Sequence, residues 1–251
     1  MKVSLILTTF NSAANLSGTL KSIEEQDYPD IEVVIKDGGS TDGTLKLIRS
    51  FEKRSRFPVR FTSSPDTGIY DAMNQGYALS TGDVIVFFND LFTSKSSVSK
   101  IMNLLASADA EDVAGAHADL VYAEGERIVR YWHMGPQKPL FTGWMPGHPT
   151  LFLKRRIYET YGLYDTSLRI SADYEYIVRF LKDKKNRLVY LPETIIRMYY
   201  GGTSNQTFGS YVTSFMEGTR GLIKNGVRPA FLISCFRTVR VLLQFVRKRR
   251  P

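Results

Sequence analysis

The sequence predicts an α/β protein whose central sheet is mostly parallel and flanked by helices. Short, continuous apolar runs recur at 3–8, 31–35 and 84–88, and buried parallel strands have this composition. Between these runs, apolar residues recur at helical spacing. Small polar and acidic residues follow the runs. Strands that alternate with helices favour a parallel, Rossmann-like sheet with helices on its faces.

The first half of the chain supplies the regular strand–helix units. A helix with Leu16, Leu20 and Ile23 on one face follows the first strand, and Pro29 ends it. A second helix opens near Thr44. The elements that complete this half are a short strand at 59–62, a helix at 71–80 and a buried strand at 84–88.

The second half is less regular, and its expected elements are shorter. Glu124-Gly125 can turn a hairpin between 120–123 and 127–131. Residues 132–148 are rich in glycine, proline and aromatic side chains, which indicates a loop that lines a site. Further strands are expected at 150–153, 188–191 and 195–199, and helices at 155–161, 173–181 and from 229 onward.

Positive charge is concentrated at the carboxyl end of the chain. The net charge is +8, yet nine of the 33 basic residues and none of the 25 acidic ones lie in residues 218–251, so residues 1–217 are nearly neutral. A nucleic-acid-binding protein more often spreads positive charge over a folded face. The separated charge therefore indicates an anionic surface as the partner, and not a nucleic acid.

The tail has the composition of a helix that lies in a membrane interface. An apolar face with Cys235, Val239 and Leu242 lies opposite Arg237 and Arg240, and four more basic residues end the chain. The alternative is a terminal helix that packs on the domain or on a second copy of the chain. Two arginines within the helix disfavour a membrane-spanning segment.

Two further observations bear on the compartment. The apolar run 3–7 is too short for a secretory signal, and no stretch has the ~20 apolar residues that span a bilayer. The lone cysteine, Cys235, excludes an internal disulfide and fits a reducing compartment. We therefore expect a cytoplasmic protein that is peripheral on the inner membrane.

Polar residues follow four expected strands, and ligands bind beyond the carboxyl ends of strands in open parallel sheets. A carboxylate there can accept hydrogen bonds from a base or a ribose, and a glycine lets the ligand approach the backbone. A further carboxylate can offer hard oxygen ligands to Mg²⁺ or Mn²⁺. The residues are Thr9 and Asn11 after the first strand, Asp37 and Gly38 after the second, Asp66 after the third, and Asn89 and Asp90 after the fourth.

Five segments stand in a recognisable order: Thr8–Asn11, Asp37–Thr44, Ser64–Gly76, Asn89-Asp90 and Ile170–Glu175. In this order they resemble the family 2 glycosyltransferases, the inverting group with a GT-A fold. The likeness is closest to bacterial members that build surface polysaccharide, and it covers roughly residues 2–200. Its most specific parts are 66–76 and 147–152 with 172–174. The tail lies outside it.

The resemblance implies roles for the matching residues. Thr9 and Asp37 match positions that hold the nucleotide base. Asp71 and Asn74 match positions near the ribose and phosphates of the donor. Asp173 matches the general base.

Further donor contacts are expected from Asn11, Gly38, Asp66, Asn89 and His148. Other interpretations stay open for some of these side chains. Asp66 can be a turn former, and His148 can be a buried, hydrogen-bonded histidine. Asp173 can instead cap the helix that follows it.

Asp90 matches the final aspartate of the family's metal-binding motif, so the implied cofactor is a divalent cation, Mg²⁺ or Mn²⁺. Family members often read Asn-Ser-Asp-Asp at this point. Here Asn89-Asp90 is shortened and keeps one carboxylate. One aspartate, with diphosphate oxygens and waters, can still hold Mg²⁺, which keeps much of its hydration.

The predicted reaction is direct displacement at the anomeric carbon of a UDP-, dTDP- or GDP-linked sugar by a hydroxyl of a glycan or lipid-linked acceptor. A sugar nucleotidyltransferase is one alternative, but it usually has a glycine-rich basic loop after the first strand, which Thr8–Asn11 is not. A catalytically degenerate scaffold is the other, and the shortened metal motif motivates it.

The expected organisation is one domain over residues 1–217 followed by the tail 218–251. Within the domain, 1–118 is the nucleotide-sugar-binding half and 119–217 the acceptor-binding half. A second copy of the chain is a further candidate partner.

Overall fold

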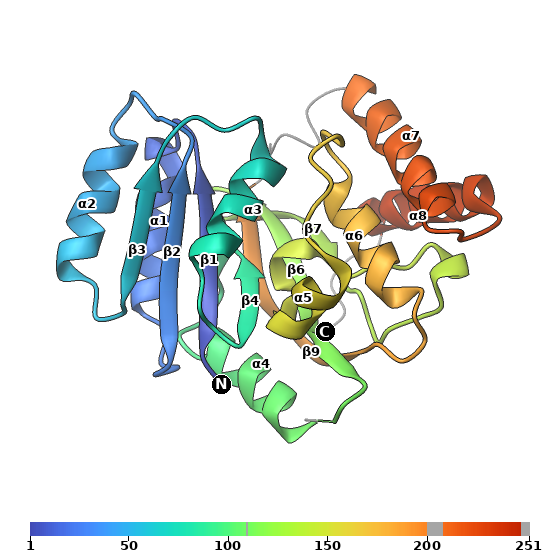
Figure 1. The fold of residues 1–251 in the computed structure, drawn as a ribbon, viewed down its shortest axis with the longest axis horizontal. Helices are drawn as coiled ribbons and strands as arrows, with labels where there is room; N and C mark the ends of the chain where they lie inside the picture. The colour runs from blue at the N-terminus through green and yellow to red at the C-terminus, as the bar shows by residue number, and fades with distance from the viewer. Residues whose placement is uncertain (109, 200–207, 247–251) are drawn as a thin grey trace.

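The structure is a computed structural model that describes residues 1–108, 110–199 and 208–246. A nine-stranded sheet runs through the molecule, with helices on both of its faces (Figure 1). The first four strands in space, in the order β3-β2-β1-β4, are parallel to one another. They are β1 (Val3–Thr9), β2 (Ile31–Asp37), β3 (Val59–Ser63) and β4 (Val84–Phe87).

The rest of the sheet is mixed. β8 pairs antiparallel with both β4 and β6, β9 lies parallel to β6, and the edge strand β5 is antiparallel to β9. β7 extends the sheet as a hairpin with β6. These strands are β5 (Leu91–Phe92), β6 (Val113–Glu124), β7 (Arg127–Trp132), β8 (Phe152–Lys154) and β9 (Arg187–Tyr199). The predicted α/β class with a largely parallel sheet is confirmed, and the parallel part carries the polar strand ends.

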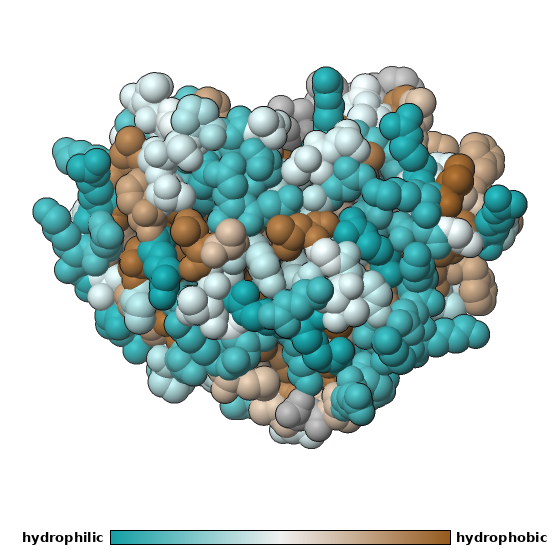
Figure 2. Space-filling model, in the orientation of Figure 1, coloured by the Kyte–Doolittle hydropathy of each residue, from teal (hydrophilic) through white to brown (hydrophobic). Residues whose placement is uncertain are grey.

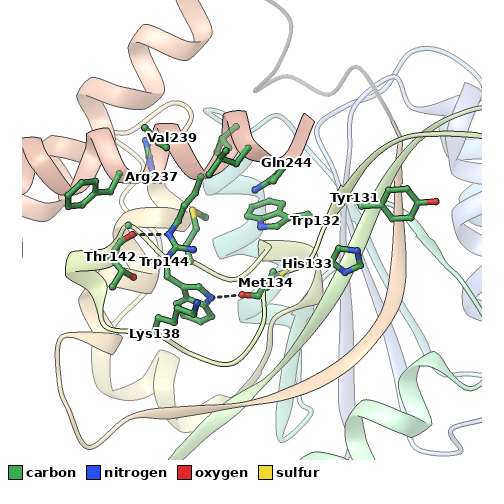
Figure 3. Close-up of a pocket in the computed structure, with 16 residues that line it drawn as sticks. Tyr131, Trp132, His133, Met134, Lys138, Thr142, Trp144, Arg237, Val239 and Gln244 are labelled. Atoms are coloured by element: carbon green, nitrogen blue, oxygen red, sulfur yellow. Dashed lines mark hydrogen bonds between the residues drawn. The ribbon is translucent and has the colours of Figure 1, made fainter. Parts of the chain in front are cut away.

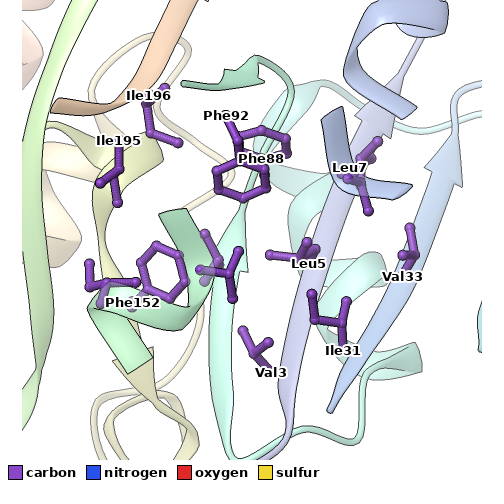
Figure 4. Close-up of a cluster of buried hydrophobic side chains, with 14 of the residues drawn as sticks. Val3, Leu5, Leu7, Ile31, Val33, Phe88, Phe92, Phe152, Ile195 and Ile196 are labelled. Carbon is purple, nitrogen blue, oxygen red and sulfur yellow. The ribbon is translucent and has the colours of Figure 1, made fainter. Parts of the chain in front are cut away.

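Helices cover both faces of the parallel strands, which explains why β1, β2 and β4 are buried at nearly every position. One core contains Leu5 and Leu7 of β1, packed with α1 (Ala13–Glu24), α2 (Thr44–Arg54) and α4 (Ser97–Ser107), and Figure 4 shows part of it. On the other face, Ile6 packs with α3, α5 and α6. The bounds of these helices are α3 (Ile69–Leu79), α5 (Arg155–Tyr161) and α6 (Ala172–Leu181).

Several elements differ from what the sequence patterns predicted: β5 and α7 (Phe208–Lys224) were not expected, and β9 is one strand where two were expected. The sequence analysis did not anticipate α4, although Val98, Ile101, Met102 and Leu105 recur at helical spacing and are buried. The first half of β6 was also missed because small residues obscure it. Gly115 is needed there, since a Cβ would lie 2.2 Å from the carbonyl oxygen of Phe152. The small residues of this strand are explained by its close packing against the neighbouring strand β8, and not by a high β-propensity.

The C-terminal part forms two packed helices, α7 (Phe208–Lys224) and α8 (Ala230–Val246), at one side of the molecule (Figure 1). The expected boundary between residues 217 and 218 therefore falls inside α7. No helix of the described residues has the length and apolar character needed to cross a bilayer. The expected basic run at 247–250 lies outside the described residues.

The tail helix turns its arginines inward. Arg237 is buried, stacks over Tyr174 at 4.2 Å from the ring centroid, and donates to the carbonyl oxygen of Ser214 at 2.8 Å. Arg240 donates to the carbonyl oxygen of Thr142 at 2.8 Å. The apolar residues of α7 and α8 face outward instead, and Figure 2 shows apolar side chains at this edge. They include Met216, Ile223, Phe231, Leu232, Phe236, Val239, Leu242 and Leu243.

A buried carboxylate connects the amino ends of the parallel strands through hydrogen bonds. Glu32 of β2 is fully buried, pairs with Lys2 at 2.7 Å and accepts hydrogen bonds from Ser4, Thr81 and Gly82. Burial acts to raise the pKa of Glu32, but these donors outweigh it and lower the pKa from 4.5 to about 2. The ionised form therefore stabilises the fold.

Glu32→Gln should lower the free energy of unfolding at pH 7 by about 3 kcal/mol, because the shift of more than two pKa units is lost. Because the folded pKa is depressed, this stabilisation is present above pH 4.5 and is lost as the pH falls towards 2. Urea unfolding followed by circular dichroism at several pH values measures it. Glu25→Gln, at an exposed ion pair, is the control. An equal loss of stability in both variants would contradict the stabilising role of the ionised Glu32.

Candidate active site

Asp37 organises the loops that follow the parallel strands. Its carboxylate is fully buried at the end of β2 and accepts five hydrogen bonds. The donors are the hydroxyls of Thr9, Ser40 and Ser63 and the backbone N–H groups of Gly39 and Ser40, at 2.5–2.9 Å. Burial acts to raise the pKa of Asp37, and these hydrogen bonds overcome it and lower the pKa. The carboxylate thus joins the ends of β1, β2 and β3.

A buried lysine lies beneath the same loops. Lys36 donates to the carbonyl oxygens of Asp37 and Ser64 and lies 3.3 Å from a carboxylate oxygen of Asp66. The sequence analysis missed Lys36, because a lysine within a strand otherwise reads as a solvent-facing residue. Gly38 passes close to Asp66, where a Cβ would lie 2.8 Å from the carboxylate. The loop after β2 is therefore held close to the loop after β3.

A polar cavity of about 670 Å³ opens above these loops. Four predicted donor contacts line it: Thr9, Asn11, Asp66 and Asn89. Asn89 exchanges two hydrogen bonds of 3.0 Å with Thr8, which joins the ends of β1 and β4. Asn11 has a φ of 47° and accepts a hydrogen bond from the N–H of Thr41 at 2.9 Å. The structure thus gathers these residues from separate loops at one edge of the sheet.

Asp71 and Asn74 lie on α3. Asp71 accepts hydrogen bonds from Thr67 and Gln75 and lines a cavity of about 400 Å³ beside the polar one. Asn74 uses both ends of its amide on the backbone of Tyr164, at 3.0 Å each. Asn74 thus fixes the loop at 164 to α3, and its contact with a donor stays a prediction.

Asp173 lies in the first turn of α6, two residues after Ser171, which is the residue at the N-cap position. The hydroxyl of Tyr70 lies 3.1 Å from its Oδ1 and 2.6 Å from the carbonyl oxygen of Ile170. Burial, followed by the nearby charge of Asp173, raises the pKa of Tyr70. Tyr70 therefore stays protonated and contacts one oxygen of the carboxylate, and Asp173 is among the residues that line a cavity.

Glu217 of α7 holds the segment in front of Asp173. Its carboxylate accepts hydrogen bonds from the N–H groups of Arg169, Ile170 and Ser171 at 2.9–3.0 Å. These are free N–H groups at the start of a helix, and a carboxylate there also complements the helix dipole. The sequence analysis missed Glu217 because nothing local signals a partner 46 residues away.

His148 and Asp173 line the same cavity. Its Nε2 is 2.8 Å from the hydroxyl of Tyr164, and its ring stacks with Phe87 at 5.8 Å. Burial lowers the pKa of His148, opposed by the charge of Asp173. The histidine is therefore neutral at pH 7, and it lines the same cavity as Asp173.

Asp90 is the predicted metal ligand, and no cluster of three candidate ligands occurs among the described residues. The carboxylate is buried and accepts one hydrogen bond of 3.3 Å, from the N–H of Tyr199. Burial raises its pKa to about 7. A buried carboxylate with so few partners suits a cation, and Mg²⁺ commonly takes one or two carboxylates with phosphate oxygens and waters. Asp90 lines none of the three cavities that surround Asp173 and the strand ends, and a metal ion at this carboxylate stays a prediction.

Three neighbouring cavities share wall residues, and together we call them the cleft. Gly68 and Ile69 line both the polar cavity and the cavity beside Asp71. Ile170 lines that second cavity and a third, of about 440 Å³, which contains Asp173 and His148. Tyr199 lines the third cavity and the polar one. The cleft thus brings together side chains from most of the expected site.

A further cavity of about 400 Å³ lies beneath α8 (Figure 3). There the indole N–H of Trp144 donates to the carbonyl oxygen of Met134 at 2.9 Å, and Arg240 bonds Thr142. Trp132 and Arg237 line both this cavity and the one with Asp173, so they separate the two. These contacts hold α8 against the loop at 134–145.

The parallel sheet, the polar cavity at its strand ends and the adjoining carboxylate define a glycosyltransferase with the GT-A architecture. Residues 4–177 match the family described as Glycosyl transferase family 2. The chain belongs to this family.

Relatives and solved structures agree with this class. A PGL/p-HBAD biosynthesis glycosyltransferase of Mycobacterium tuberculosis is 29% identical over 212 residues, which are 80% of this chain and 78% of the relative. The crystal structure of S. aureus TarS 1-349 in complex with UDP-GlcNAc covers 97% of this chain and 73% of its own, with 16% identity and a TM-score of 0.72.

A second structure has a similar fold. The mannosyltransferase PcManGT from Pyrobaculum calidifontis, in complex with GDP-Man and Mn²⁺, covers 100% of this chain and 76% of its own, with 18% identity and a TM-score of 0.67.

Glu217→Ala should lower kcat for sugar transfer by about 10–100-fold. Without Glu217 the segment before Asp173 can shift, and a catalytic carboxylate displaced by ~1 Å loses its alignment with the substrate. Affinity for the donor should be unchanged, because Glu217 contacts the segment before the base and not the polar cavity. Steady-state kinetics and calorimetric donor binding separate the two, and Glu217→Gln should recover part of kcat. The control is Glu193→Ala, at an exposed ion pair with Lys100. Unchanged kcat in Glu217→Ala would refute this role.

Proposed function

We propose that this enzyme moves a sugar from a nucleotide-sugar donor to an acceptor hydroxyl with inversion at the anomeric carbon, in the synthesis of bacterial surface glycans. The observation that carries the proposal is the position of Asp173, in the cavity that adjoins the polar one. A donor in the polar cavity and an acceptor beside Asp173 would meet at the shared wall. The UDP-GlcNAc and GDP-Man of the two similar structures support a UDP-, dTDP- or GDP-linked donor.

The reaction is one displacement. The acceptor oxygen forms a bond to the anomeric carbon while the bond from that carbon to the diphosphate oxygen breaks. The proton of the acceptor hydroxyl passes to a carboxylate oxygen of Asp173, and the nucleoside diphosphate leaves with the electron pair. Tyr70 holds the other oxygen of Asp173, so the receiving oxygen keeps a fixed direction.

The polar cavity would hold the donor through short, neutral side chains. Asn11, Asn89 and Thr9 can bond the nucleobase and ribose. Gly38 does not line this cavity; it packs against Asp66 and Phe10, which do. Asp90 would hold the divalent cation, which when bound neutralises charge on the diphosphate. Asp37 would act indirectly. Its five hydrogen bonds fix the shape of the loop after β2, and that loop would contact the nucleobase.

We also propose that the enzyme is peripheral on a membrane through α7 and α8. The outward side chains Phe231, Leu232 and Leu242 are 67%, 47% and 60% exposed, and apolar insertion rather than arginine contact would attach these helices. Placement on the cytoplasmic face stays a prediction.

Asp173→Asn should lower the transfer rate by about 10²–10⁴-fold, the range that a general base contributes. Donor binding should stay intact because the amide preserves the shape of the site. Product formation and calorimetry with the donor measure the two effects. Asp112→Asn, at an exposed ion pair with Arg187, is the control. Full transfer activity in Asp173→Asn would remove the assignment of the base.

Phe231→Glu should weaken binding to phosphatidylglycerol-containing vesicles by about tenfold, since a buried phenyl ring contributes 1.5–3 kcal/mol. Co-sedimentation with vesicles measures it, and Ile128→Glu, at an exposed position on β7, is the control. Equal loss in both variants, or no sedimentation of the wild type, would end the membrane proposal. A vesicle-independent dimer that Phe231→Glu dissociates would show that a second copy covers this face.

A further inference from the structure

The cavity that contains Asp173 differs in character from the rest of the cleft. The donor side is lined largely by short polar side chains such as Thr9, Asn11 and Asn89. The 440 Å³ cavity beside Asp173 is lined mainly by aromatic and aliphatic side chains. They include Trp132, Met145, Tyr174, Phe215, Val241 and Leu242. A sugar presents hydroxyls over most of its surface, and this wall offers them few partners.

The two arginines in this wall do not make it a polar surface. Arg237 lies over the ring of Tyr174 at 4.2 Å and bonds the backbone of Ser214. Arg130 lies over the ring of Tyr122 at 3.7 Å. Each guanidinium lies over an aromatic ring of the same wall. Among the described lining residues, Asp173 is the one carboxylate.

The mouth of the cavity joins the outward face of the C-terminal helices. Tyr211 and Val212 of α7 and Leu242 of α8 line the cavity and are also 46%, 42% and 60% exposed. The same edge carries the apolar side chains visible in Figure 2. An apolar chain could therefore run from the cavity onto this face without crossing a polar surface.

We propose that this cavity binds a lipid chain attached to the acceptor and presents the acceptor hydroxyl to Asp173. The inference rests on the proposed function, since it takes Asp173 as the base. Binding of the apolar group does not depend on that catalytic role. Burying a methylene group contributes about 0.8 kcal/mol, so the affinity of the cavity should rise with the length of the apolar group.

The test measures binding without catalysis. Tryptophan fluorescence is followed while n-octyl β-D-glucoside, below its micellar concentration, or methyl β-D-glucoside is added, because Trp132 lines the cavity. The octyl compound should bind saturably and at least about tenfold more tightly than the methyl compound. Equal affinity for the two compounds would overturn the inference.

Matched variants on α7 locate the binding. Val212→Asn, inside the cavity, should weaken octyl glucoside binding by roughly fivefold, while Ile223→Asn, on the same helix at 57% exposure and outside this cavity, should not. Equal weakening by both would assign the binding to the outward helix face and defeat the inference. Hydrolysis of nucleotide sugar by water should be unaffected by Ile223→Asn, whose side chain lies outside the cavity. If the wild type binds octyl glucoside but neither transfers nor hydrolyses any nucleotide sugar, the proposed function is rejected and the inference about the cavity stands.

Discussion

The buried carboxylate of Asp37 is the constraint on which the donor side of the cleft depends. Its five hydrogen bonds bring the ends of three parallel strands and the loop at 38–40 into one arrangement. Leaving even one such buried donor without a partner costs about 1–3 kcal/mol, so the loops have little freedom to open. The polar cavity above them is accordingly formed before any ligand arrives, which lowers the entropy lost on binding.

The acceptor side is built differently. It depends on helices that follow the sheet, because α7 and α8 supply walls of the apolar cavity and Glu217 fixes the segment before the base. The family likeness ends at residue 177, yet Glu217 and Arg237 lie beyond it. Residues beyond the range matched by the family model thus contact the segment around Asp173, through Glu217 at Ser171 and Arg237 at Tyr174.

The sequence predicted the parallel strands well because their apolar runs are short, continuous and separated by helical spacing. It also placed Thr9, Asn11, Asp66 and Asn89 at one edge, since strand ends in a parallel sheet must meet there. It did not anticipate the inward direction of Arg237. A helical pattern shows which residues share a face, but stacking on Tyr174 decides which face is buried, and that contact spans 63 positions of sequence.

Tyr199 belongs to both sides of the cleft. It is the last residue of β9, its N–H bonds Asp90, and its ring lines the polar and the apolar cavities. A nucleotide that displaces this ring reshapes the neighbouring chamber as well. Thermodynamic linkage then requires each ligand to alter the affinity for the other by the same factor, so a single side chain can couple the two cavities.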